Sequence, residues 1–289
     1  MSASVLSAPR AHPRTPDKPG PFIETHDGVR LFWTEWGEGP PVLFLHSWAM
    51  ETRMWDYQFA ALAEAGFRCL GYDRRGHGRS DLPANGYDFD TFADDLSAVI
   101  DALDLCDLTL VGHSMGCNEI ARYLARHGDA RVARVAFLAP VTPCLLQRPD
   151  NPAGLPAEAF AAMRAAWARD FQGWIAENTD GFFVPETSPA LKRWGAEMLA
   201  RTPLTVALAC NEALTAEDFR ADVAAIRVPT LILHGDADVS APLALTGEAT
   251  AALIDGATLQ VYAGAPHGLM YTHMQQLNED LARFLRSAS

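Results

Sequence analysis

The segment VGHSMG, residues 111–116, carries a serine between two glycines. Gly112, Ser114 and Gly116 match the pattern G-x-S-x-G, in which a sharp turn from a strand into a helix projects a serine hydroxyl. A run with strand chemistry, LTLVGH, leads into the turn, and a run with helix chemistry, MGCNEIARYLARHG, follows it. The glycines suit this turn because a side chain at either position would collide with a neighbouring element. Ser114 is therefore the candidate nucleophile rather than part of a plain Gly-Ser turn.

A serine alcohol needs a base to remove its proton, so a histidine and an orienting carboxylate must lie nearby. Around such a turn the chain order is serine, then acid, then histidine, each after its own strand. LILHGDADVSAP offers Asp236 and Asp238, and LQVYAGAPHG then offers His267 as general base and acid. Asp238 is favoured because the loop must leave the strand before a carboxylate can turn toward the histidine. Asp236 is then a turn or capping residue.

An acyl-transfer site also needs two backbone amides that bind the developing oxyanion. One is predicted at Met115, directly after the nucleophile, where the helix N-terminus also favours negative charge. The second is predicted in the loop FLHSWAM, at Trp48, with the neighbouring Ser47 as the alternative donor. The indole of Trp48 is also a candidate wall of the substrate pocket.

Other residues with reactive side chains receive simpler interpretations. His46 and His113 lie at predicted strand ends, where they are expected to tie loops together by hydrogen bonds. Cys117 is expected to pack, since no base is placed for it. No cluster has metal-ligand spacing, and no glycine-rich stretch matches a dinucleotide fingerprint, so neither a metal nor a cofactor is predicted.

The elements that must position these residues alternate along the chain. Residues 21–37 predict a hairpin at a sheet edge. Continuous apolar runs that end at His46, Asp73, His113 and Pro140 predict strands buried on both faces, with helical patterns between them. This order requires a parallel sheet with right-handed crossovers. Strand patterns return in VPTLILHGD and ATLQVYAGAPHG, before a final helix.

Between residues 141 and 226 the alternation stops, and amphipathic helical runs appear instead. We interpret this stretch as a helical lid over a core formed by residues 21–140 and 227–289. Trp167 and Phe171 in the lid are candidate pocket residues, although most aromatic side chains here are expected to pack within the insertion itself.

Composition limits the class of protein. The chain has 289 residues, 49% of them hydrophobic, and a formal charge of -13, which disfavours nucleic acid or an anionic membrane as partner. Its five cysteines are scattered and odd in number, which indicates a reducing, cytoplasmic location. Residues 1–20 are rich in Pro and Ser and lack the apolar region of a secretion signal, so a disordered leader is predicted. No stretch is long and apolar enough to span a membrane.

Taken together, these motifs resemble the α/β-hydrolase family from about Phe22 to the C-terminus. The closer likeness is to the bacterial cofactor-free (non-haem) haloperoxidase and esterase group, serine hydrolases that hydrolyse small esters and can make peracids from acetate and peroxide. The matching stretches are YDRRGHGRSD, ADDL, GHSMG, EIARYLARHG and GAPHGL. The resemblance implies a mostly parallel twisted sheet with helices on both faces and a helical lid.

Residue by residue, the resemblance implies a triad of Ser114, Asp238 and His267, with Trp48 and Met115 donating to the oxyanion. One stretch departs from the group. Where the group has His-Gly-Trp-Pro in the oxyanion loop, this chain has HSWA, residues 46–49. The missing proline is associated with positioning peroxide, so peracid formation is in question, and the missing glycine leaves the donor open to small backbone shifts.

The expected function is cofactor-independent hydrolysis of a small or medium, mostly apolar ester or lactone through an acyl-serine intermediate. The alternatives are perhydrolase or haloperoxidase-like activity, or cleavage of a carbon–carbon bond next to a ketone, with the same triad. A ligand-binding receptor of the same fold is a third alternative. Epoxide hydrolases and haloalkane dehalogenases have aspartate as nucleophile, and Ser114 argues against both. The sequence specifies neither the natural substrate nor the oligomeric state, and it is compatible with a homo-oligomer.

Overall fold

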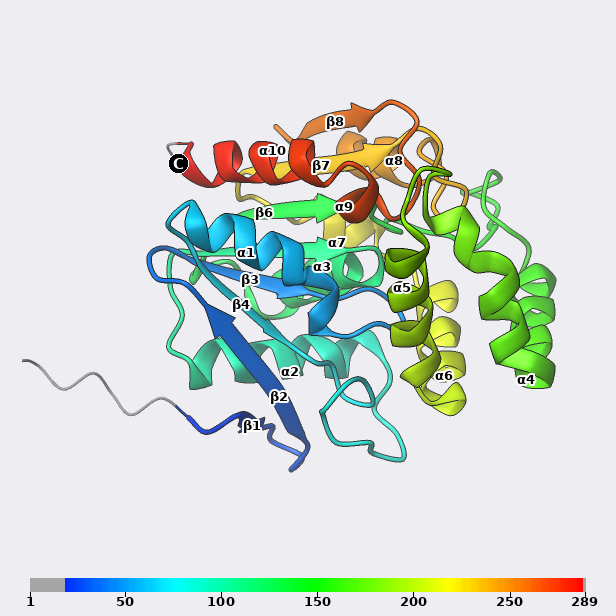
Figure 1. The fold of residues 1–289 in the computed structure, drawn as a ribbon, viewed down its shortest axis with the longest axis horizontal. Coiled ribbons are helices and arrows are strands. Elements are labelled where there is room, and N and C mark those ends of the chain that lie inside the picture. The colour runs from blue at the N-terminus through cyan, green and yellow to red at the C-terminus, as the bar shows by residue number, and fades with distance from the viewer. Residues whose placement is uncertain (1–18, 288–289) are drawn as a thin grey trace, which may run out of the picture.

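An eight-stranded sheet, in the order β1-β2-β4-β3-β5-β6-β7-β8, forms the centre of the molecule (Figure 1). The structure is a computed structural model that describes residues 19–287, so nearly all of the predicted leader lies outside the described residues. β1 (Phe22–Glu24) and β2 (Arg30–Trp36) form the predicted antiparallel hairpin, and β2 also pairs antiparallel with β4 (Arg68–Tyr72).

From β4 onward, neighbouring strands pair in parallel. These strands are β3 (Pro41–Leu45), β5 (Leu108–His113), β6 (Val132–Leu138), β7 (Thr230–Gly235) and β8 (Thr258–Tyr262). All six residues of β5 are buried, as expected for a central strand with helices on both faces. The predicted mostly parallel sheet is therefore confirmed.

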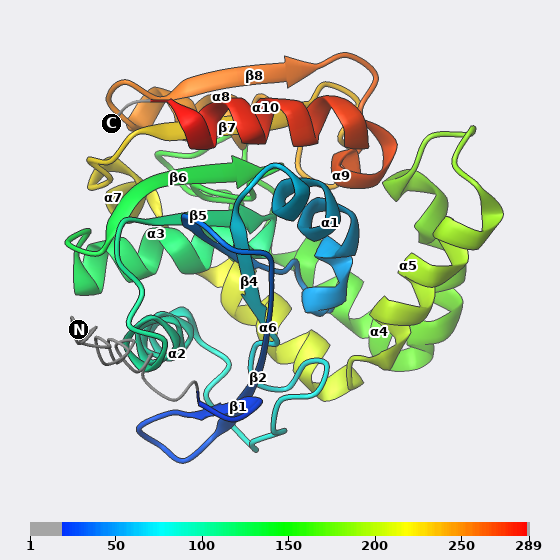
Figure 2. The same ribbon diagram turned by 60° about the vertical axis from the view of Figure 1, so that its left-hand side comes forward.

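Side chains of successive strand residues enter two different cores, because they alternate between the faces of the sheet. Leu43 of β3 packs with α2 (Phe89–Ala102) and α3 (Met115–His127). Phe44 packs on the other face, with α1 (Asp56–Glu64) and α10 (Met274–Arg286). Figure 2 shows the helices on the two sides of the sheet.

The predicted insertion between β6 and β7 is helical. It comprises α4 (Ala157–Asn178), the short 3-10 helix η2 (Thr179–Phe182), α5 (Pro189–Arg201), α6 (Leu204–Ala216) and α7 (Arg220–Ala224). In Figure 1, α4, α5 and α6 lie beyond the tips of the parallel strand arrows, at the carboxyl ends of those strands. α7 differs from them, since it packs back onto the core, where Asp222 accepts a hydrogen bond from Arg122 of α3 at 3.0 Å.

Two predicted helices are interrupted. α4 has a non-helical residue at Asp170 (φ -156°, ψ 84°), whose carboxylate accepts the Gly173 amide at 2.7 Å and so caps the second half of the helix. The final helical run splits at His273 (φ -120°) into α9 (Leu269–Thr272) and α10. A short helix, α8 (Gly247–Leu253), lies between β7 and β8 in the sequence.

Candidate active site

Ser114 lies in the turn between β5 and α3. Its backbone (φ 54°, ψ -118°) is in a region that residues with a side chain seldom adopt. The turn is tight, as predicted: a Cβ on Gly112 would lie 2.8 Å from the Cys117 nitrogen, and one on Gly116 would lie 2.5 Å from the Leu45 carbonyl oxygen. The amide of Ser114 donates to the Leu138 carbonyl at 3.0 Å, which fixes the turn against the next strand.

Asp238 and His267 come from the loops that follow β7 and β8. His267 Nδ1 lies 2.7 Å from Asp238 Oδ2, and the other carboxylate oxygen accepts the Ser240 and Ala241 amides at 2.9 and 2.8 Å. Each of the two residues is only 5% exposed. Asp236 is exposed and accepts the Gly264 amide at 2.6 Å. The structure thus brings Asp238, rather than Asp236, to the histidine.

The environment of Asp238 favours its charged form. Burial alone would raise the pKa of Asp238, but the charge of His267 and hydrogen bonds from His234, His267 and the Ala241 amide hold it well below its usual range. The ionised carboxylate can only accept hydrogen bonds, so the ring nitrogen that faces it, Nδ1 of His267, carries a proton. Nε2 of His267 then carries a lone pair and can act as a base.

His113 links His267 to the turn that carries Ser114. It directly precedes Ser114, and its Nε2 hydrogen-bonds the His267 carbonyl at 2.9 Å, with the two ring centroids 4.7 Å apart. Burial lowers the pKa of His113 to about 3, so the ring is neutral and its Nε2–H donates. This contact confirms the predicted hydrogen-bonding role of His113 and sets His267 beside the residue before Ser114.

Two residues near His267 were not found from the sequence. Phe182, at the end of η2, packs against the rings of His113 and His267 at centroid distances of 6.1 and 5.7 Å. His234, at the end of β7, is fully buried, and its Nε2 lies 2.8 Å from the Ala241 carbonyl and 3.3 Å from Asp238 Oδ2. The histidine in LILHGD was a visible signal for His234, whereas the Phe-Phe pair after the long helix gave only a weak one.

The two predicted oxyanion donors lie on segments that touch. Met115 is the first residue of α3, so its amide has no acceptor within the helix. The close packing of Gly116 on Leu45 brings this helix end against β3, three residues before Trp48. The amide of Ser47, the alternative donor, is directed at Met54 Sδ at 3.3 Å. This arrangement favours Trp48 as the second donor.

The predicted pocket residues form one aromatic group. Trp48 stacks on Trp167 with ring centroids 4.7 Å apart and meets Phe171 and Trp174 edge-on at 6.1 Å. The Trp48 indole N–H donates to the Ala207 carbonyl of α6 at 2.8 Å. The insertion therefore packs directly on the loop that carries the predicted oxyanion donor.

Reactive side chains elsewhere have structural environments. Cys117 is buried with its Sγ 3.3 Å from the Gly112 carbonyl, and burial raises the pKa of its thiol well above the usual range. It therefore packs, as predicted. Residues 19–287 contain no group of three or more His, Cys, Asp or Glu side chains arranged to hold a metal ion. Over the same residues, none of the helices has the length and apolar character that crossing a bilayer requires.

Comparison with known proteins identifies the family. Residues 40–274 match the family model for the alpha/beta hydrolase fold. The chain is 37% identical over 272 residues to non-heme chloroperoxidase CPO-A1 of Kitasatospora aureofaciens, spanning 92% of this chain and 99% of that protein. It is 33% identical over 286 residues to the bifunctional esterase/perhydrolase DCH of Acinetobacter calcoaceticus, with 92% and 99% covered.

The solved structures agree with the sequence relatives. The esterase EaEST of Exiguobacterium antarcticum superimposes with a TM-score of 0.90 at 32% identity, covering 93% of this chain and 100% of that one. The protein therefore belongs to the α/β-hydrolase family. Within that family it matches the bacterial non-haem haloperoxidase and esterase group, which confirms the resemblance seen in the sequence.

Proposed function

We propose that the protein is a serine hydrolase that cleaves a small or medium carboxylic ester or lactone through an acyl-serine intermediate. The observation that carries the proposal is the 2.7 Å contact between the Asp238 carboxylate and His267 Nδ1. This pair lies beside His113, the residue that precedes Ser114. A hydroxyl, an acid and a base, carried in this order by the segments that follow β5, β7 and β8 at one sheet edge, constitute the machinery of acyl transfer.

In the proposed reaction, Ser114 Oγ attacks the substrate carbonyl as its proton passes to His267 Nε2. The amides of Trp48 and Met115 donate hydrogen bonds to the carbonyl oxygen and stabilise the negative charge that develops on it. His267 then gives its proton to the departing alcohol, while Asp238 stabilises the imidazolium form. Water, deprotonated by His267, attacks the acyl-serine in the second half, which releases the acid and restores the hydroxyl.

We further propose that residues 141–226 act as a lid and that its aromatic side chains select the substrate. Trp167 and Phe171 pack on Trp48, next to the proposed oxyanion site. An acyl or alcohol group in contact with this wall would meet aromatic carbon, so apolar groups are favoured there.

Hydrolysis of short p-nitrophenyl esters tests the proposal. Purified protein is expected to turn these esters over, and Ser114→Ala is expected to abolish that turnover. A fluorophosphonate should add its mass to the peptide that carries Ser114 and to no other. Wild-type activity that survives in Ser114→Ala, or label on a different residue, would contradict the assignment of the nucleophile.

A second candidate function is perhydrolysis, in which hydrogen peroxide instead of water attacks the acyl-serine and releases a peracid. The similarity to a chloroperoxidase and to an esterase/perhydrolase favours it. Ala49 argues against it, since its φ of 53° is outside the range that proline can adopt. The oxyanion loop therefore differs in backbone as well as in sequence from the His-Gly-Trp-Pro pattern.

Measuring peracid formation from acetate and peroxide beside ester hydrolysis distinguishes perhydrolysis from hydrolysis. A panel of lactones and β-diketones tests the remaining substrate classes.

A further inference from the structure

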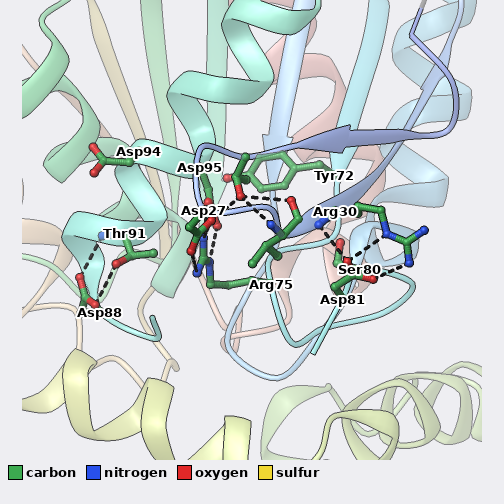
Figure 3. Close-up of polar contacts among 12 residues, drawn as sticks. Asp27, Arg30, Tyr72, Arg75, Ser80, Asp81, Asp88, Thr91, Asp94 and Asp95 are labelled. Carbon is green, nitrogen blue, oxygen red and sulfur yellow. Dashed lines mark hydrogen bonds and ion pairs between the residues drawn. The ribbon is translucent and has the colours of Figure 1, made fainter. Parts of the chain in front are cut away.

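Two consecutive arginines after β4, Arg74 and Arg75, are both buried, yet they reach different parts of the molecule. Arg75 donates to Asp95 of α2 at 2.7 Å and to Asp27 of the β1–β2 turn at 2.9 and 3.1 Å (Figure 3). Arg74 reaches toward α3 and the end of β3 instead. Its Nε donates to Glu119 Oε2 at 2.8 Å, and a second, shorter bond comes from Nη2.

Glu119 lies on the nucleophile helix, four residues after Met115, and is fully buried. Its other carboxylate oxygen accepts the hydroxyl of Tyr72, whose pKa is raised well above its usual range by burial and by the charge of Glu119. A buried ion pair is costly to desolvate, and pairs of this kind are weak evidence for stability. The contacts of Arg74 indicate another role.

Arg74 holds His46 in a defined protonation state. The Arg74 amide donates to His46 Nε2 at 2.9 Å, and Arg74 Nη2 donates to the His46 carbonyl at 3.0 Å. Burial and the charge of Arg74 lower the pKa of His46 well below its usual range, so the ring is neutral. Because Nε2 accepts, the single ring proton is on Nδ1. The 3.3 Å approach of Arg74 Nη1 to Nδ1 is then a contact between two N–H groups and not a hydrogen bond.

The Nδ1–H of His46 donates to the Ser47 carbonyl at 2.8 Å. This carbonyl and the Trp48 amide are the two ends of one planar trans peptide, so they point in opposite directions. Fixing the carbonyl toward His46 therefore fixes the direction of the Trp48 N–H. That N–H is the proposed second donor to the oxyanion.

We propose that Arg74 and Glu119 are positioning residues that hold the Trp48 amide in register with the nucleophile helix, acting through His46. This inference rests on the proposed function. The first oxyanion donor, Met115, begins α3. Glu119 on the same helix forms an ion pair with Arg74, which orients the second donor, the Trp48 amide. The ion pair therefore ties the two donors to each other across two segments that are about 70 residues apart in the sequence.

Arg74→Lys tests the proposal, with Arg75→Lys as its matched control. Lysine keeps the buried positive charge beside Glu119, but one ammonium group cannot span both Glu119 and the His46 carbonyl as the guanidinium does. Arg75→Lys makes the same chemical change in the neighbouring residue, whose partners are Asp27 and Asp95. Glu119→Gln and Asp95→Asn repeat the comparison from the acidic side.

Arg74→Lys and Glu119→Gln are expected to lower kcat for p-nitrophenyl butyrate at least about tenfold, since one oxyanion donor is worth roughly 10²–10³ in kcat. KM should change less than about threefold, because the donor acts mainly in the transition state. The inhibition constant of a trifluoromethyl ketone, whose adduct places an oxyanion in the same site, should rise by a similar factor. Both controls should stay within about twofold of wild type in kcat. Equal losses in the Arg74 and Arg75 variants would overturn the proposal.

A measurement on the wild-type protein covers the case in which a variant does not fold. Nitrogen NMR of the histidine rings should show His46 as the neutral form protonated on Nδ1, and the Nε2-protonated form would overturn the inference. The Ser114→Ala variant distinguishes the proposed hydrolase function from the positioning role of Arg74 and Glu119. Retained turnover in this variant contradicts the proposed function itself. Loss of turnover in Ser114→Ala with normal kcat in folded Arg74→Lys contradicts only the positioning role.

Discussion

Replacing Asp238 with asparagine examines the proposed triad most directly. In the wild type, Oδ1 accepts two backbone amides, from Ser240 and Ala241, while Oδ2 accepts His267 Nδ1. Asparagine has one acceptor oxygen, and the two amides require it at the Oδ1 position. Its NH₂ group must then face the ring, so Nδ1 of His267 has to accept and the ring proton moves to Nε2. His267 in that form cannot take the proton of Ser114.

The expected loss in kcat is about 10⁴-fold, the size of effect that a wrong histidine tautomer has in a serine triad. At about 1.36 kcal/mol per factor of ten, this corresponds to roughly 5.4 kcal/mol of lost transition-state stabilisation. The assay is initial-rate hydrolysis of p-nitrophenyl butyrate, with active sites counted by fluorophosphonate labelling and folding checked by circular dichroism.

Asp236→Asn is the matched control, since Asp236 is exposed and its contact is with the Gly264 amide. It should lose about 1 kcal/mol of stability or less and retain its turnover. If folded Asp238→Asn kept more than a tenth of wild-type kcat, the tautomer argument would be refuted. A large loss in Asp236→Asn alone would make that residue the partner of His267.

Three further predictions follow from the backbone and the charges. Gly116→Ala should lower the free energy of unfolding by about 1–3 kcal/mol, because the new Cβ would lie 2.5 Å from the Leu45 carbonyl oxygen; a urea midpoint equal to wild type would contradict the close contact. Ala49→Pro should cost more than about 1 kcal/mol, because proline cannot adopt a φ of 53°, whereas Ala49→Gly should cost less; equal unfolding curves for the two variants would speak against this loop conformation. Hydrogen bonds from Arg75 hold the pKa of Asp27 well below its usual value of 3.8, so Asp27 contributes stability above that pH and loses it as the pH falls. Asp27→Asn should therefore flatten the acid side of a plot of melting temperature against pH, and an unchanged slope would count against the pair.

The parts of the structure that depend on local pattern were predictable from the sequence. The parallel sheet follows from alternating buried strands and helices, and the positions of Ser114, Asp238 and His267 follow from their places after strands. Phe182 and the Arg74–Glu119 pair were not predicted, because each depends on a contact between segments that are distant in the sequence. The break in α4 was also missed, since the apolar spacing continues through Asp170 while its carboxylate caps the next turn.

The contact of Phe182 with His267 bears on how relatives of this protein could be recombined. The insertion would be an obvious module to exchange, because it is encoded as one block between β6 and β7. Yet Phe182, which belongs to the insertion, also packs on the ring of His267, the proposed base. The Phe182 carbonyl accepts the Gly268 amide at 3.1 Å. A chimaera that receives foreign helices therefore also receives a foreign neighbour for that ring. Its turnover would change along with its preference for substrates, unless residues 179–182 were kept from the recipient.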